Sequence, residues 1–145
     1  MRAALLTALL LAAGAAAAQQ PPLPTVELGA GMHRIRAEVA ASDASRMLGL
    51  MHRTALPPNG GMLFVFDEVD RHCMWMKNTP LPLSVAFVDE RGAIVNIADM
   101  QPHTEDAHCA ARPARYALEM AQGWFAARGI RAGQRLRGLG KVAPR

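Results

Sequence analysis

The sequence predicts a mainly β fold, an antiparallel β-sandwich or jelly-roll-like domain with two short helices. Three features support this prediction. Short segments that are apolar, or that alternate between apolar and polar residues, recur along the chain. Residues typical of turns separate these segments, and only two stretches have the spacing of a helix. The short connections favour antiparallel hairpins over a parallel α/β sheet.

The first predicted elements are a strand and a short helix. From His33 to Val39 apolar and polar residues alternate, as in a strand with one buried face. Ser42 or Asp43 can cap a helix that follows. The apolar side of this helix consists of Met47, Leu50 and Met51.

The middle of the chain predicts a buried strand between two turns. Residues 57–61, Pro-Pro-Asn-Gly-Gly, break regular structure. Residues 62–66 are continuously apolar, which is typical of a central strand. The acidic residues 67–70 are expected to form a turn, and residues 72–77 a further strand.

The C-terminal half predicts a hairpin and three shorter elements. Residues 83–88 and 93–98 flank Asp-Glu-Arg-Gly, a hairpin signal. A long loop is expected over 102–113 and an alternating strand over 115–120. The last elements expected are a helix over 122–128, with Gly129 as its C-terminal cap, and a strand over 134–139. The total is about seven or eight strands.

The N-terminal residues 1–18 are expected to be a Sec-type signal peptide. Arg2 precedes a run that is almost wholly Ala and Leu, and a small-x-small pattern ends at Ala18. A membrane anchor is the alternative, but the apolar run is shorter than the roughly 20 residues that a bilayer requires. The expected location is therefore the periplasm or the cell exterior. The remaining chain divides into a Pro-rich leader with a possible first strand (19–31), a single β-rich domain (32–140) and a short tail (141–145).

Composition limits the class of partner. The formal net charge is +4, and the basic residues are scattered along the chain. Nucleic-acid binding proteins usually gather their basic residues on one face or helix. We therefore expect no nucleic-acid partner, no membrane span after signal cleavage and no cofactor. An unknown small molecule or an envelope protein is the expected partner.

Cys73 and Cys109 are the two cysteines of the chain. In an exported protein an even number favours a disulfide, here worth roughly 3–4 kcal/mol in the chain-entropy description. Two buried thiols or a soft metal site are the alternatives. A copper site would draw on weak candidates near the cysteines, because thioether and imidazole groups suit copper. These candidates are His72, Met74, Met76, His103 and His108.

Three stretches together resemble one known family. They are residues 46–53, 61–66 and 75–83, followed downstream by 116–119 and 129–130. With these motifs the chain resembles the domain-of-unknown-function 192 (DUF192) family over roughly residues 33–138. The resemblance implies a mainly antiparallel sandwich or jelly-roll-like fold, often exported, and no established activity. Ser84 departs from the family pattern, which usually has Asp there, so a role for that carboxylate is in doubt in this chain.

The candidate site residues lie in three of these motifs, 46–53, 75–83 and 116–119. Candidate ligand-binding residues are Arg46, Trp75, Lys77, Asn78, Thr79 and Glu119. Residues 77–79 could supply donors at the rim of a cleft walled by Trp75, or they could form a structural bend. Arg46 and Glu119 could form a buried ion pair with each other or with Lys77.

Three functions remain open. A non-enzymatic periplasmic binding or envelope-accessory module is preferred, because no complete catalytic motif is present. A small hydrolase-type enzyme would use Glu119 and Lys77 as catalytic candidates, with Glu119 as a general acid or base. Copper binding through the Cys, His and Met clusters is the third.

Overall fold

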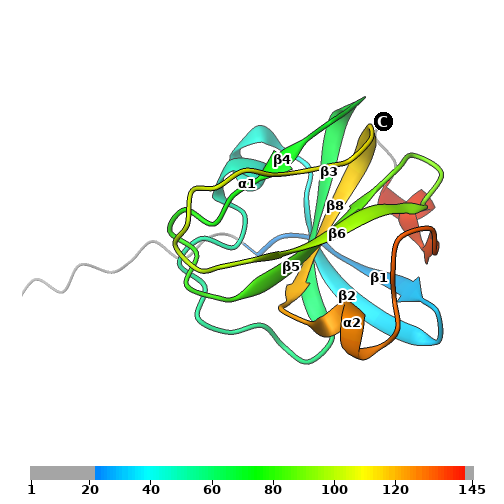
Figure 1. The fold of residues 1–145 in the computed structure, drawn as a ribbon, viewed down its shortest axis with the longest axis horizontal. Coiled ribbons are helices and arrows are strands. Elements are labelled where there is room, and N and C mark those ends of the chain that lie inside the picture. The colour runs from blue at the N-terminus through cyan, green and yellow to red at the C-terminus, as the bar shows by residue number, and fades with distance from the viewer. Residues whose placement is uncertain (1–21, 143–145) are drawn as a thin grey trace, which may run out of the picture.

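The computed structural model describes residues 22–142, and it is mainly β with two short α-helices, as expected (Figure 1). The strands are β1 (Thr25–Ala30), β2 (His33–Ala40), β3 (Gly60–Asp70), β4 (Cys73–Met74), β5 (Leu83–Val88), β6 (Ile94–Met100), β7 (His108–Cys109), β8 (Ala114–Ala121) and β9 (Leu136–Arg137). The helices are α1 (Asp43–Leu48) and α2 (Trp124–Ala127), and a 3₁₀ turn, η1, covers Leu139–Val142.

One curled sheet of seven strands dominates the fold. Its order is β6-β5-β8-β3-β2-β1-β9, and β4 and β7 form a separate two-stranded ladder. The expected sandwich or jelly roll is not confirmed, because a single sheet bends into a half-barrel (Figure 1). The sheet is also not purely antiparallel, since β2 and β3 run parallel. The long connection 41–59, which includes α1, allows this parallel pairing.

The three central strands β3, β5 and β8 are buried on both faces of the sheet. One core lies beneath α2 and η1, and Leu118 and Met120 of β8 point into it. The second core lies beneath Leu50 and Met76, and Ala117 of β8 points into it. Burial on both faces explains why these strands are nearly continuous apolar runs. The predicted central strand over 62–66 and the predicted hairpin (β5 and β6) are confirmed.

Two predictions around residue 70 are wrong. The acidic residues 67–70 continue β3 instead of forming a turn, because Asp70 pairs with Ala114 of β8 beyond a bulge. The predicted strand over 72–77 shrinks to β4, because the Met76 N–H donates to the Thr104 carbonyl outside any strand. Burial nevertheless alternates in this segment, with Met76 fully buried and its neighbours exposed.

Both helices are shorter than predicted. Ser42 caps α1 and forms a reciprocal capping box with Ser45. The helix ends at Leu48, so Leu50 lies in the following turn, and Met47 is 78% exposed instead of facing the core. Helix α2 covers only 124–127 of the expected 122–128, and the expected last strand over 134–139 is reduced to β9.

The structure describes only part of the N-terminal segment for which predictions were made. The expected signal peptide, residues 1–18, lies outside the described residues. Strand β1 lies in the segment where a first strand was possible, and it pairs with β2 and β9. No helix within residues 22–142 is long and apolar enough to cross a membrane.

Candidate functional site

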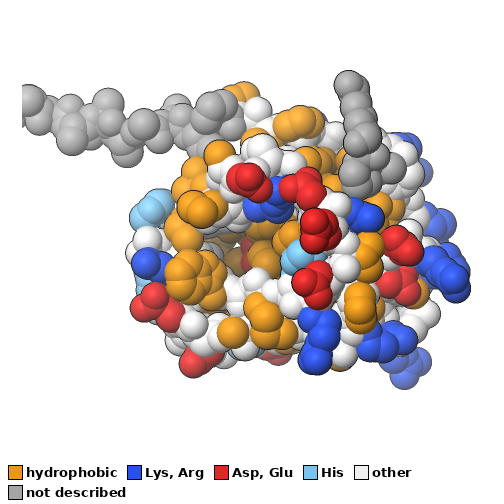
Figure 2. Space-filling model, turned by 90° about the horizontal axis from the view of Figure 1, so that it is seen from above, with side chains coloured by type: hydrophobic (Ala, Val, Ile, Leu, Met, Phe, Trp, Pro, Cys, Tyr) orange, Lys and Arg blue, Asp and Glu red, His pale blue; other side chains and the backbone are white. Residues whose placement is uncertain are grey.

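A narrow pocket opens on the side of the sheet covered by α1 and β4. Figure 2 shows a hollow on this side that is bordered largely by hydrophobic side chains. The pocket has a volume of about 30 Å³, room for roughly two water molecules. Its lining consists of residues 46–51 from α1 and the following turn, Phe64 of β3, Met74 of β4, Trp75, Thr79 and Glu119 of β8. We call it the Glu119 pocket.

Glu119 is the buried acid of this pocket. Its side chain projects from β8 on the same face as Met62 and Val85, its partners across the sheet, and it is 3% exposed. None of the hydrogen bonds or ion pairs found within residues 22–142 includes its carboxyl group. Burial without a partner raises the pKa of Glu119 from 4.5 to about 8. At neutral pH the carboxyl group is therefore mostly protonated.

The segment 75–79 contributes Trp75 and Thr79 to the outer wall of the pocket. The Thr79 N–H donates to the Met76 carbonyl, and the Thr79 carbonyl accepts from the His103 N–H. The His52 N–H donates to the Asn78 carbonyl at 2.8 Å. These backbone bonds hold Trp75 and the buried Thr79 in place against the pocket, while Trp75 remains 47% exposed at its mouth.

Arg46 lines the pocket but is fully engaged elsewhere. Its guanidinium donates to Asp43 and Asp67, and to the carbonyls of Ala41 and Val65. These bonds tie α1 to the end of β3. The predicted ion pair between Arg46 and Glu119 is therefore wrong. The acid lies at the sheet, whereas the guanidinium points to the rim.

Lys77 and Asn78 are exposed and are not among the residues that line the pocket. The Lys77 ammonium lies over the ring of Trp75, 5.2 Å from its centroid. Asn78 adopts a left-handed backbone conformation with φ of 52°, and its contribution is the carbonyl that His52 contacts. The pocket thus brings together Arg46, Trp75, Thr79 and Glu119 of the predicted set, and leaves out Lys77 and Asn78.

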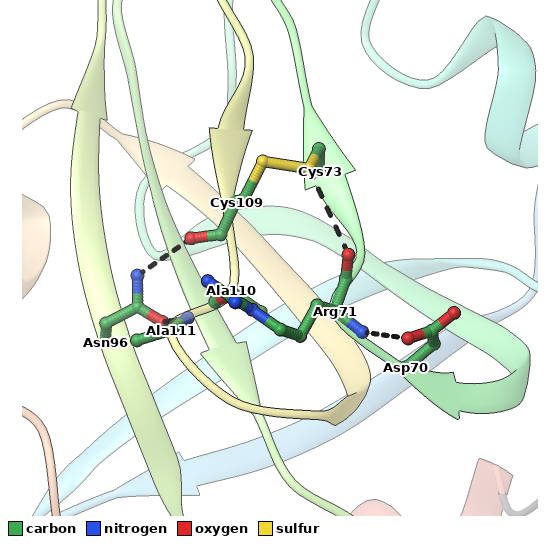
Figure 3. The surroundings of a disulfide bond; sticks show 7 residues. All are labelled: Asp70, Arg71, Cys73, Asn96, Cys109, Ala110 and Ala111. Atoms are coloured by element: carbon green, nitrogen blue, oxygen red, sulfur yellow. Dashed lines mark hydrogen bonds between the residues drawn. A yellow bond between two sulfur atoms is a disulfide. The ribbon is translucent and has the colours of Figure 1, made fainter.

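Cys73 and Cys109 are joined by a disulfide, as predicted (Figure 3). They are directly opposite each other in the β4–β7 ladder. Asn96 of β6 fastens this ladder to the sheet, because its side chain donates to the Cys109 carbonyl and accepts from the Ala111 N–H. Met74 and Trp75 follow Cys73 directly, so the disulfide holds the outer wall of the pocket.

The weak metal candidates are dispersed. His72 stacks on Phe66, with ring centroids 3.7 Å apart, and its Nε2 lies 2.9 Å from the Glu68 carbonyl. Met76 is buried in the second core, and His103 lies in the loop after β6. His108 faces Met74 across the β4–β7 ladder. Within residues 22–142 no three His, Cys, Asp or Glu side chains gather as metal ligands, and both cysteine sulfurs are used by the disulfide.

Several residues that line the pocket are not predicted from the sequence. The sequence places Met47 and Met51 on the apolar side of a helix and Phe64 in a buried strand, and does not mark them as pocket residues. Met47 and Trp75 are among the large apolar side chains that the described part of the chain exposes. The available signal was the methionine content of the 46–53 motif, because Met is common at binding surfaces as well as in cores.

Ser84, which departs from the family pattern, has a structural environment of its own. It is 1% exposed in β5, and its hydroxyl donates to Asp99 of the neighbouring strand β6 at 2.5 Å. The same oxygen accepts from the Gly123 N–H at 2.9 Å. A carboxylate therefore reaches this place from the adjacent strand, outside the Glu119 pocket.

Comparison with known proteins gives a family and a fold. The sequence profile of the DUF192 family, described as "Uncharacterized ACR", matches residues 25–138. A candidate transcription regulator from Sinorhizobium meliloti 1021 is 34% identical, with a TM-score of 0.78 over 84% of this chain and 99% of its own. A protein of unknown function from Novosphingobium aromaticivorans DSM 12444 is 30% identical, with a TM-score of 0.72 over 83% of this chain and 94% of its own. Comparison with curated proteins finds no match.

Proposed function

Because the chain belongs to the DUF192 family, which is described as uncharacterised, we propose a function from the site alone. The protein is a non-enzymatic binding module that seats a thin, largely apolar group of a ligand or partner protein in the Glu119 pocket. The ligand would be recognised by the apolar walls of the pocket and by one buried polar group, the Glu119 carboxyl. Apolar walls with a few polar groups are the usual composition of a small-molecule site.

One observation carries this proposal: a carboxyl group that is 3% exposed lines a pocket open to the surface and has no partner among the described residues. A buried polar group without a hydrogen bond costs roughly 1–3 kcal/mol by mutational measures. Exposed Met47 and Trp75 at the mouth add apolar area that a bound group would cover.

We further propose that the module works outside the cytoplasm, in the periplasm or after secretion. The composition of residues 1–18 supports this. The disulfide is compatible with it, because structural disulfides persist in oxidising compartments. Expression of the full chain in a Gram-negative host tests the proposal. Processed protein in the periplasmic fraction should begin at Gln19, and retention of the full chain in the cytoplasm would contradict it.

A hydrolase-type enzyme is supported less well. Glu119, with its pKa raised to about 8, could serve as a general acid. The pocket lining offers no second reacting group, since Arg46 is engaged with two aspartates and the Thr79 hydroxyl donates to the Lys77 carbonyl. The transcriptional role named for the Sinorhizobium relative also gains no support here. The α-helices of residues 22–142 have six and four residues, too short to serve as the recognition helix of the common DNA-binding motifs.

Methionine-methyl NMR tests the binding proposal. Met47, Met51 and Met74 line the pocket, whereas Met32 lies in the turn after β1 and is 90% exposed. The probes are n-butylamine, n-butanol, butanone and butyrate, which share a thin stem and differ in the head group. At least one should shift the three pocket methyls and leave Met32 unchanged.

Matched variants locate the effect. Met47→Ala should weaken binding of the active probe severalfold, whereas Met32→Ala, which removes another largely exposed methionine, should not. If none of the four probes shifts the pocket methyls, or if both variants weaken binding equally, the pocket is not a binding site.

A further inference from the structure

We propose that the Glu119 pocket receives the ammonium end of a linear aliphatic amine, of the kind that a lysine side chain presents. This inference rests on the proposed binding function and names the chemistry of the occupant. The ammonium group would contact the Glu119 carboxylate, and the aliphatic stem would lie between Met47, Met51, Met74 and Trp75.

The missing partner of Glu119 is the first step of the argument. The side chain is buried, yet the described residues supply neither a hydrogen bond nor a cation to its carboxyl group. Every side-chain nitrogen or oxygen of the same residues that is fully closed off from solvent has a hydrogen-bond partner, so the unpaired Glu119 oxygens must still be open to the pocket. The carboxyl group can therefore be satisfied only from the space of the pocket. A buried carboxylate is stabilised most strongly by a cation that also donates hydrogen bonds.

The walls and the volume select the shape of that cation. Thioether, aliphatic and aromatic side chains favour an aliphatic stem, because such a stem gains contact and loses exposed apolar area. At about 30 Å³ the pocket is narrow. An ammonium is a compact point charge on a thin stem, whereas a guanidinium is a wide planar fork. The narrow space therefore favours an amine over an arginine-like group.

The mouth of the pocket already shows how an ammonium binds there. Trp75 is partly exposed, and the Lys77 ammonium lies 5.2 Å from the centroid of its ring. Aromatic faces attract cations in this geometry. The indole that holds Lys77 at the rim is also a wall of the pocket, so an entering amine meets a surface suited to its charge.

The charges around Glu119 permit a cation. Among the residues that line the pocket, Arg46 is the one other charged group, and Asp43 and Asp67 neutralise its guanidinium at the rim. The elements packed against Glu119 present the uncharged Phe64 from β3, Val85 from β5 and Met74 from β4. Lys77 lies outside the lining.

A distinctive pH dependence follows. Glu119 has a pKa of about 8 when the pocket is empty, so a bound ammonium must first displace its proton. Amine affinity should increase about tenfold for each pH unit between pH 6 and 8, and level off above pH 8 until the amine itself loses its proton near 10. A neutral acceptor such as an alcohol or ketone would bind the protonated acid, so its affinity should change by no more than about twofold between pH 6 and 8 and fall about tenfold per pH unit above pH 8.

Titration of the protein with n-butylamine and n-butanol between pH 6 and 9 tests this, with the pocket methionine methyls as the readout. We expect the amine to bind at least tenfold more tightly than the alcohol at pH 8.5. Glu119→Gln, which keeps the shape of the side chain, should weaken the amine at least tenfold and leave the alcohol within about twofold. Met47→Ala, which keeps Glu119, should weaken both probes, and it serves if the Gln variant does not fold.

The outcomes separate the two proposals. If n-butanol binds as well as n-butylamine at pH 8.5, or if amine affinity falls between pH 6 and 8, the amine inference is wrong and the binding module stands. If Glu119→Gln leaves amine binding unchanged, the ammonium does not contact Glu119 and the inference is wrong. If neither probe binds, the amine inference is wrong, and the binding module fails as well if butanone and butyrate also leave the pocket methyls unshifted. Two further probes, Nα-acetyl-lysine amide and a pentapeptide with a central lysine, distinguish a free amine from the lysine side chain of a partner protein. If the occupant is a lysine side chain, both should bind about as tightly as n-butylamine. If it is a free small amine, the peptide should bind more weakly.

Discussion

At the scale of the residue, Glu119 departs most clearly from its surroundings. Leu118 and Met120 point into one core, and Glu119 points into the other between Met62 and Val85. The sequence reveals the flanking apolar residues and therefore predicts that Glu119 is partly buried. It does not reveal which cation the acid meets, because that depends on where distant elements place Arg46 and Lys77. The prediction of an ion pair failed for this reason.

The pH dependence of stability checks the protonation of Glu119. Its pKa is about 8 when folded and 4.5 in the reference state, so the folded protein binds the extra proton. The stabilising contribution is fully present below pH 4.5 and is lost as pH rises through 8, at up to about 1.4 kcal/mol per pH unit. Urea unfolding at pH 5, 7 and 9 should show this decline in the wild type, and Glu119→Gln should flatten it. Glu105→Gln, in an exposed loop, is the control; an equal flattening there would exclude Glu119 as the cause.

Asn78 provides a test of structural against ligand-binding roles. Its φ is 52°, and its side chain makes none of the hydrogen bonds found in residues 22–142. Asn78→Val should lower the free energy of unfolding by about 1–2 kcal/mol, because a branched side chain is strained in this conformation. Asn78→Gly should change it by less than about 0.5 kcal/mol. Chemical denaturation measures both, and a Gly variant as unstable as the Val variant would show that the amide group itself matters.

At the scale of the element, β4 and β7 depend on their connections. Each has two residues, so a ladder this short is not stable alone. The disulfide and the Arg71 side chain, which donates to the Ala110 carbonyl, join its two sides. The Asn96 side chain fastens the ladder to β6 of the sheet. The sequence predicts the disulfide from the cysteine count, but it overestimates the strand after Cys73 because alternation continues beyond the hydrogen-bonded ladder.

Removal of the disulfide should destabilise the protein and open the pocket wall. The covalent loop spans 36 residues, so Cys73→Ser with Cys109→Ser should cost about 3–4 kcal/mol of unfolding free energy. Guanidinium denaturation measures this loss, and chemically reduced wild type should match the double variant. Amide exchange of Met76, which donates to the Thr104 carbonyl, should accelerate more than exchange in β8. A loss below about 1 kcal/mol would mean that the other connections suffice to hold the ladder.

At the scale of the whole molecule, the sequence predicts the class of fold better than its architecture. Alternation and apolar runs reveal β2, β3, β5, β6 and β8, because these patterns follow directly from burial on one or two faces. The curl of the sheet and the parallel β2–β3 pair arise from contacts between strands that are distant in the chain. The Glu119 pocket has the same origin, since α1, β3, β4 and β8 each supply part of its lining.

Gly61 lies where the two halves of the sheet meet, and it tests this architecture. Strand β3 joins β6-β5-β8 to β2-β1-β9, and Gly61 pairs with Met120 on one side and Ala37 on the other. A Cβ at this position would collide with the Glu119 carbonyl and the Met120 sulfur. Because the carbonyl belongs to the backbone of β8, the strands would have to separate. Gly61→Ala should therefore lower the free energy of unfolding by about 3 kcal/mol or more.

Gly140→Ala is the matched control, since a Cβ there meets no atom within 4 Å and its backbone is not left-handed. It should change stability by less than about 0.5 kcal/mol. Thermal and urea unfolding of both variants measure the difference, and near-ultraviolet circular dichroism reports on the packing of Trp124 in the first core. Since one strand serves both cores, the Gly61 variant should lose them in a single transition. Two separate transitions would show instead that the halves of the sheet fold independently of the β3–β8 pairing.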